Sequence, residues 1–213
     1  MKKISLLIFS FFLIIPSLVF AQEIKDDPRV KEALHLLELW LDAQVAYDEL
    51  LGLSIAVVHD QEVLWKGGIG YAHPEQKVPA TSKTIYSICS ISKLFTSVAT
   101  MQLRDAGKLH LDDPAGKHLP WFSIEQQYDE SPPVTVKGIL THSSGLPREA
   151  GYGYWSAPDF DFPTREQIIE KLASQQTLYP ADTYFQYSNL GMSLLGEIVA
   201  AVSGEDYADY VQK

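Results

Sequence analysis

Two short segments of the sequence combine residue types that can perform nucleophilic chemistry. The first is Ser90-Ile91-Ser92-Lys93, in which a hydroxyl and an amine are three positions apart. If the segment opens a helix, both side chains lie on one face and the amine can reach the hydroxyl. The helix N-terminus would also place backbone N–H groups near the serine oxygen, where they stabilise an oxyanion. Loss of water around Lys93 would lower its pKa and let it act as a base.

The Ser-x-x-Lys spacing is a weak signal by itself. A chain of this length contains about one such pattern by chance, and this one occurs once in the sequence. Taken alone, the spacing favours an ordinary N-capping serine followed by a surface lysine.

The second segment is Tyr187-Ser188-Asn189, which precedes an apolar helical pattern. A tyrosine hydroxyl can transfer protons when a neighbouring lysine lowers its pKa. An asparagine amide can hold a carbonyl group or orient the lysine. The alternative is a loop tyrosine followed by an N-capping Ser or Asn.

The elements that must position these segments can be predicted from hydrophobic patterns. The spacing of apolar residues predicts helices at 27–48, 90–106, 136–141, 164–174, 189–202 and from Glu205 onward. Thr164 and Gln167 fit a capping box, and Gly107 fits a helix C-terminal glycine. Residues 53–71 read as a β-hairpin around a polar turn at 59–62, while 111–114 read as a turn.

The flanks of both segments resemble one family. Tyr86–Thr96 is similar to the nucleophile region of class C β-lactamase-related hydrolases, and Phe185–Gly191 to their tyrosine segment. Further blocks resemble the same family in the same order, at Gly52–Tyr71, Gly107–Pro114, Ile139–Pro147 (ILTHSSGLP) and Leu194–Glu197. The chain is therefore identified as the N-terminal portion of a member of the β-lactamase and penicillin-binding-protein superfamily, which includes D-Ala-D-Ala carboxypeptidases.

The resemblance implies a role for each candidate residue. Ser90 would be the acylated nucleophile, with its backbone N–H as one half of the oxyanion hole. Lys93 and Tyr187 would form the proton-transfer pair, and which of them is the base stays open because a coupled pair shares its titration. Asn189 would contact the carbonyl side of the substrate. The implied activity is an acyl-enzyme hydrolysis of an amide or ester, such as a β-lactam, a D-Ala-D-Ala-type peptide or a small ester.

The resemblance also implies the fold, an α/β (α+β) β-lactamase/transpeptidase-like architecture. An antiparallel sheet would begin with the hairpin at 52–71, be flanked by helices, and be joined by a helical lobe from about 90 to 200. Residues 22–213 would form one partial domain. The family's third motif, a His- or Lys-x-Gly on a late strand, does not occur in these 213 residues, so the sheet should be incomplete and an apolar helix face exposed. The alternative function is therefore a truncated, non-catalytic penicillin-recognising or interaction protein.

The composition of the chain excludes several classes of binding partner. The net charge of −10 and pI near 5.0 argue against binding to nucleic acid or an anionic membrane. The six histidines show no HExxH or other close metal-ligand spacing, so we expect no metal and no cofactor. His142 is expected to stabilise its loop and not to be a catalytic base. Cys89, the only cysteine, is expected to be a buried small side chain and not a second nucleophile.

Residues 1–21 have the layout of a cleavable signal peptide. Lys2 and Lys3 precede an apolar run from Ile4 to Ile15, and Ala21 supplies a small residue at the cleavage point. The sequence thus predicts a periplasmic or secreted protein with no stable membrane anchor after cleavage. The expected partner is a small-molecule or peptide substrate, and the oligomeric state stays open.

Overall fold

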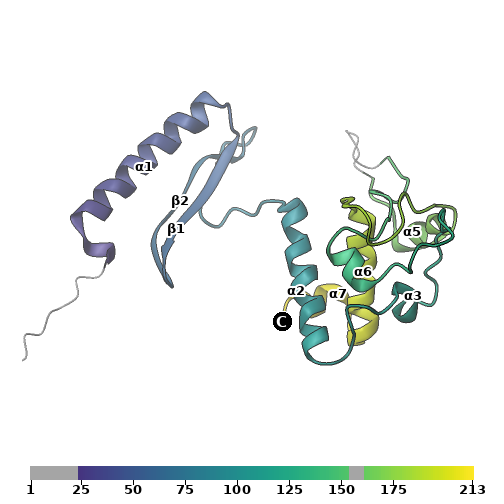
Figure 1. Ribbon diagram of the computed structural model, residues 1–213. Coiled ribbons are helices and arrows are strands. Elements are labelled where there is room, and N and C mark those ends of the chain that lie inside the picture. Colours follow the sequence, from purple (N-terminus) through teal and green to yellow (C-terminus); the bar gives the residue numbers. More distant parts are fainter. Residues whose placement is uncertain (1–23, 154–160) are drawn as a thin grey trace, which may run out of the picture. The chain divides into compact units, whose positions relative to one another are not determined.

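The computed structural model describes residues 24–153 and 161–213. The chain divides into two compact units, one ending at Tyr86 and the other running from Ser87 to Lys213, whose elements are labelled in Figure 1. The predicted signal peptide, residues 1–21, lies outside the described residues. Over the two described ranges, no helix is both long enough and apolar enough to cross a membrane.

The first unit contains a short 3-10 turn, η1 (Ile24–Asp26), followed by helix α1 (Pro28–Tyr47). Asp27 caps α1, because its carboxylate accepts the backbone N–H of Arg29 at 2.8 Å. Proline at the first helical position loses no hydrogen bond there, so Pro28 favours the start of the helix at this point. The predicted helix at 27–48 is therefore confirmed.

The sheet of the first unit has three antiparallel strands in the order β1-β2-β3. Strands β1 (Gly52–His59) and β2 (Glu62–His73) pair along their length, from Gly52 opposite Gly70 to His59 opposite Glu62. The short strand β3 (Val78–Pro79) pairs with the end of β2. This confirms the predicted hairpin and the incomplete antiparallel sheet.

The longer secondary-structure elements of the second unit are all helices. It contains η2 (Cys89–Ile91), α2 (Ser92–Asp105), α3 (Ala115–His118), α4 (Val136–Leu140), α5 (Arg165–Leu172), α6 (Asn189–Ser203) and α7 (Tyr207–Val211). The predicted capping box of Thr164 and Gln167 is present at the start of α5. Gly204 ends α6 in a left-handed conformation, with φ of 77°.

Helix α6 is the centre of the core of this unit. Its buried apolar residues recur at spacings of three and four positions, so they form one broad face that packs against the other helices. These residues are Leu190, Leu194, Leu195, Ile198 and Val199. Helix α2 contributes Ala99 and Leu103 to the same core and lies against α6. The packing fixes the N-termini of both helices, where the candidate residues of the two segments lie.

The opposite face of α2 is apolar as well. Within the second unit, Leu94, Phe95 and Val98 are each more than half exposed. Within this unit, one face of α2 is therefore apolar and uncovered.

One local prediction needs correction. Ser90 lies in the 3-10 turn η2 and not in the α-helix, which begins two residues later. The predicted turn at 111–114 is present, and the short helix α3, which was not predicted, follows it. The Asp113 carboxylate stabilises α3 by accepting hydrogen bonds from Lys117 Nζ at 2.6 Å and from the backbone N–H of His110 at 2.9 Å.

The core assignment predicts the effect of truncating α6. Leu195 is fully buried, so Leu195→Ala should lower the free energy of unfolding by ~2–5 kcal/mol through lost contacts and a residual cavity. Leu94→Ala on the exposed face of α2 is the matched control and should change it by about 0.5 kcal/mol or less. Denaturant unfolding followed by circular dichroism measures both, and equal losses would contradict the assignment of α6 as the core.

Candidate active site

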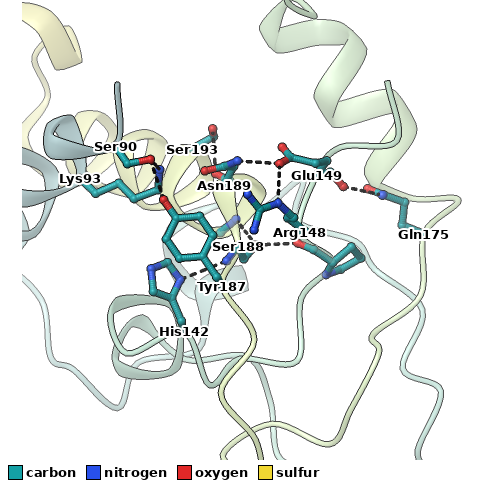
Figure 2. A network of polar contacts seen from close by, with 12 residues as sticks. Ser90, Lys93, His142, Arg148, Glu149, Gln175, Tyr187, Ser188, Asn189 and Ser193 are labelled. Carbon is teal, nitrogen blue, oxygen red and sulfur yellow. Dashed lines mark hydrogen bonds and ion pairs between the residues drawn. The ribbon is translucent and has the colours of Figure 1, made fainter. Parts of the chain in front are cut away.

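The structure brings Ser90, Lys93 and Tyr187 together. Lys93 Nζ donates a hydrogen bond to Ser90 Oγ at 3.1 Å, and the Tyr187 hydroxyl donates one to the same oxygen at 2.7 Å. Lys93 Nζ also lies 4.9 Å from the centroid of the Tyr187 ring. Figure 2 shows the hydroxyl end of Tyr187 pointing at both side chains. The Ser90 hydroxyl thus has two partners that can accept or return a proton.

The turn before α2 holds Ser90 in place. Lys93 lies in the first turn of α2, three residues after Ser90, so the two side chains share one face. Cys89 adopts a left-handed conformation with φ of 45°, which costs a non-glycine residue ~1–3 kcal/mol and is found most often at functional sites. Cys89 is exposed and its thiol contacts the Ser87 hydroxyl at 3.5 Å. The expectation that Cys89 is a buried side chain is therefore wrong.

Tyr187 reaches Ser90 because two loops are hydrogen-bonded side by side. The loop after α4 supplies carbonyl groups, and the segment before α6 supplies donors. The pairs are Leu178 N–H to Gly145 O, Asp182 N–H to Ser143 O, Ser188 Oγ to Pro147 O and Asn189 N–H to Arg148 O, at 2.6–2.8 Å. Gly145 has φ of 75°, and a Cβ there would lie 2.2 Å from Tyr179 O, so only glycine permits this approach.

Asn189 is the first residue of α6 and lies beside this group. Its Nδ2 donates to Glu149 Oε1 at 2.6 Å, and Arg148 Nε lies 3.3 Å from the same oxygen. The Arg148 guanidinium also lies 5.1 Å from the centroid of the Tyr187 ring. Sequence reasoning missed Arg148 and Glu149. Their place directly after the Gly-Leu-Pro turn was the available signal, but nothing in the sequence pairs Glu149 with Asn189.

A cavity of about 610 Å³ opens beside Ser90. Ser90, Lys93 and Asn189 form its polar side, and Phe162, Met192 and Tyr207 are among its apolar residues. Ligand pockets typically measure ~300–1,000 Å³, so the cavity has room for a small ester or the end of a peptide. In the part of the chain that the structure describes, no group of three or more His, Cys, Asp or Glu side chains could hold a metal ion.

Nearby charges tune the acidity of Tyr187. Loss of water around the phenol raises its pKa, but the hydrogen bonds with Lys93 and Ser90 and the positive charges of Lys93 and Arg148 outweigh this effect. The pKa of Tyr187 therefore lies below its ordinary value of 10. The phenolate, which can accept the Ser90 proton, is easier to form here than on a free tyrosine.

Comparison with known proteins agrees with this arrangement. A family model described as Beta-lactamase matches residues 37–213. Beta-lactamase-like protein 2 of Dictyostelium discoideum is 31% identical over 192 residues, which cover 89% of this chain and 35% of that protein.

Two solved structures have similar folds. The octameric penicillin-binding protein homologue from Pyrococcus abyssi is 34% identical with a TM-score of 0.71, and the match covers 84% of this chain and 41% of that one. A beta-lactamase/D-alanine carboxypeptidase from Yersinia pestis is 26% identical with a TM-score of 0.70, covering 84% of this chain and 52% of that one. The chain spans between about a third and a half of the length of these relatives. It has the β-lactamase/transpeptidase-like fold and belongs to the beta-lactamase family.

Proposed function

We propose that the protein is an exported serine hydrolase that forms an acyl-enzyme at Ser90 on an amide or ester. One observation carries this proposal. Ser90 Oγ accepts hydrogen bonds from both Lys93 Nζ and the Tyr187 hydroxyl, at the edge of a cavity that can admit a substrate. A surface N-capping serine would have no chemical need for two such partners.

The reaction begins when the Tyr187–Lys93 pair takes the proton of Ser90 and Oγ attacks the carbonyl carbon of the substrate. The carbonyl oxygen becomes an oxyanion, which the backbone N–H of Ser90 stabilises, while Asn189 holds the carbonyl side of the substrate. The carbon–nitrogen or carbon–oxygen bond then breaks, and the pair returns the proton to the leaving amine or alcohol. Water attacks the resulting Ser90 ester in the same way and releases the acid.

The candidate substrates are a β-lactam, a D-Ala-D-Ala-type peptide and a small ester. All three present a carbonyl that Ser90 can attack, and the mixed polar and apolar lining of the cavity suits each of them. The relative from Yersinia pestis is described as a beta-lactamase/D-alanine carboxypeptidase, which supports the first two. The predicted signal peptide at 1–21 would deliver the enzyme to the compartment that contains such substrates.

Covalent labelling tests the nucleophile. A fluorescent penicillin or a fluorophosphonate should add one equivalent to the purified protein, because the activated Ser90 oxygen attacks either probe. Ser90→Ala should remove the adduct, and Ser92→Ala, a matched change two residues away, should leave it. Intact-mass spectrometry measures the stoichiometry. A folded wild-type protein that forms no adduct would contradict the proposed hydrolase and favour the alternative, a non-catalytic penicillin-recognising or interaction protein.

Removal of the Tyr187 hydroxyl tests proton transfer. Tyr187→Phe keeps the ring but deletes the acid–base group, so the labelling rate should fall ~10²- to 10⁴-fold. In the wild type the rate should rise with pH through the lowered pKa of Tyr187, since the base form of the pair accumulates there. The exposed Tyr184 provides the control, Tyr184→Phe. Equal rates for Tyr187→Phe and Tyr184→Phe would show that Tyr187 transfers no proton.

A further inference from the structure

His142 is hydrogen-bonded on both sides of Tyr187. Its backbone carbonyl oxygen accepts the N–H of Gln186 at 2.7 Å, and its ring Nδ1 accepts the N–H of Ser188 at 3.2 Å. The residues directly before and after Tyr187 are therefore both hydrogen-bonded to His142, in the loop after α4. The proposed proton transfer does not use this histidine.

The imidazole also contacts the phenol itself. The rings of His142 and Tyr187 lie 4.6 Å apart between centroids at an interplanar angle of 37°, and Phe185 meets the imidazole edge-on at 5.8 Å. Figure 2 shows the imidazole beside the Tyr187 ring, at the end away from Ser90. With its backbone and its ring both held, Tyr187 has little freedom to swing its hydroxyl away from the Ser90 oxygen.

An unusual backbone conformation makes this double contact possible. His142 has φ of 56°, in the left-handed region that few residues other than glycine, Asn, Asp and His adopt readily. It directly follows Thr141, the C-terminal capping residue of α4. The reversal of the chain at this point turns both the carbonyl and the ring of one residue toward 186–188.

The hydrogen bond to Ser188 fixes the protonation state of the ring. Nδ1 can accept the Ser188 N–H only when it carries no proton, so the ring is neutral with its proton on Nε2. A doubly protonated ring would place two N–H donors against each other. The titratable and charged groups around the ring are Lys93 from α2, Tyr187 beside it, Arg148 over the Tyr187 ring, and Asp182, which bonds the adjacent Ser143.

The electrostatics favour the neutral ring. Burial lowers the pKa of His142 first, and the positive charge of Lys93 lowers it further, to below the ordinary value of 6.5. The ring is therefore neutral at neutral pH and becomes protonated only as the pH falls through this lowered pKa.

We propose that His142 is a positioning residue that holds Tyr187 against Ser90 only while its imidazole is neutral, so that protonation of the ring releases Tyr187 and slows acylation. This rests on the proposed function, because it assigns Tyr187 to proton transfer. His142 itself touches neither the Ser90 hydroxyl nor the proposed substrate.

Two substitutions separate the hydrogen bond from the charge. In His142→Asn, the amide Oδ1 can take the place of Nδ1 as acceptor, asparagine tolerates the left-handed backbone, and the side chain does not titrate. His142→Ala removes the acceptor. A loss of position of about 1 Å costs up to ~10²-fold in rate, so at neutral pH His142→Asn should label at least ~10-fold faster than His142→Ala.

The pH profile of labelling is the decisive readout. Below pH 6.5 the wild-type rate should show an acid limb, which is a fall steeper than the titration of the Tyr187–Lys93 pair alone produces, and His142→Asn should lack this additional fall. Equal rates for His142→Asn and His142→Ala, or an unchanged acid limb in His142→Asn, would overturn the proposal. The acid limb is decisive even if His142→Ala does not fold, because it needs only the wild type and the asparagine variant.

Nitrogen NMR separates failure of this proposal from failure of the proposed function. In ¹⁵N-labelled protein, Nδ1 of His142 should be the unprotonated ring nitrogen at neutral pH. The amide signals of Gln186 and Ser188 should shift with the same midpoint as the imidazole, and these shifts should be absent in His142→Asn. These signals need no labelling of Ser90. A proton on Nδ1 at neutral pH would overturn the positioning role, whereas the expected NMR result without any acylation would contradict only the hydrolase.

Discussion

The site depends on the row of hydrogen bonds that joins the loop after α4 to the segment before α6. Ser90 and Tyr187 are 97 residues apart in sequence, and the helix packing of α2 against α6 alone would not set the direction of a loop side chain. The paired loops do so, because donors from 178–189 meet carbonyl groups of 143–148 at 2.6–2.8 Å. The phenol is thereby held 2.7 Å from the serine oxygen. Lys93 and Arg148, whose charges favour the phenolate, lie within about 5 Å of the same ring.

The helices and the hairpin could be predicted because local patterns specify them. The capping box at Thr164, the helix-ending Gly107 and the polar turn at 59–62 are local signals, and each is present in the structure. Helix α3 could not be predicted, since it depends on the buried Asp113 carboxylate, which is hydrogen-bonded to His110 N–H, Lys117 and His118. The 3-10 turn at Ser90 was also missed, because a left-handed Cys89 has no signature in the residue type.

The candidate residues could be identified because their spacing and flanks are specific, and the structure does bring Ser90, Lys93 and Tyr187 together. The partners of these residues could not be identified in the same way. Glu149 is hydrogen-bonded to Asn189, 40 residues further along the chain, and His142 is hydrogen-bonded to Ser188, 46 residues further along. Such contacts arise from the pairing of two irregular loops, for which the sequence has no periodicity. Family membership supplies the fold, but it does not supply the charge distribution around Tyr187, which depends on Arg148 and Lys93.

In the proposed mechanism, Lys93 and its neighbours hold Tyr187 ready for proton transfer at Ser90. The most direct measurement is the titration of the Tyr187 phenol by NMR, using ¹³C-labelled tyrosine and Tyr187→Phe to assign the signal. The phenol should titrate with a midpoint below 10 in the wild type, and the midpoint should move upward in Lys93→Met, because the hydrogen bond and the charge that favour the phenolate are gone. An ordinary midpoint that is the same in both proteins would show that Lys93 does not prepare Tyr187 for proton transfer.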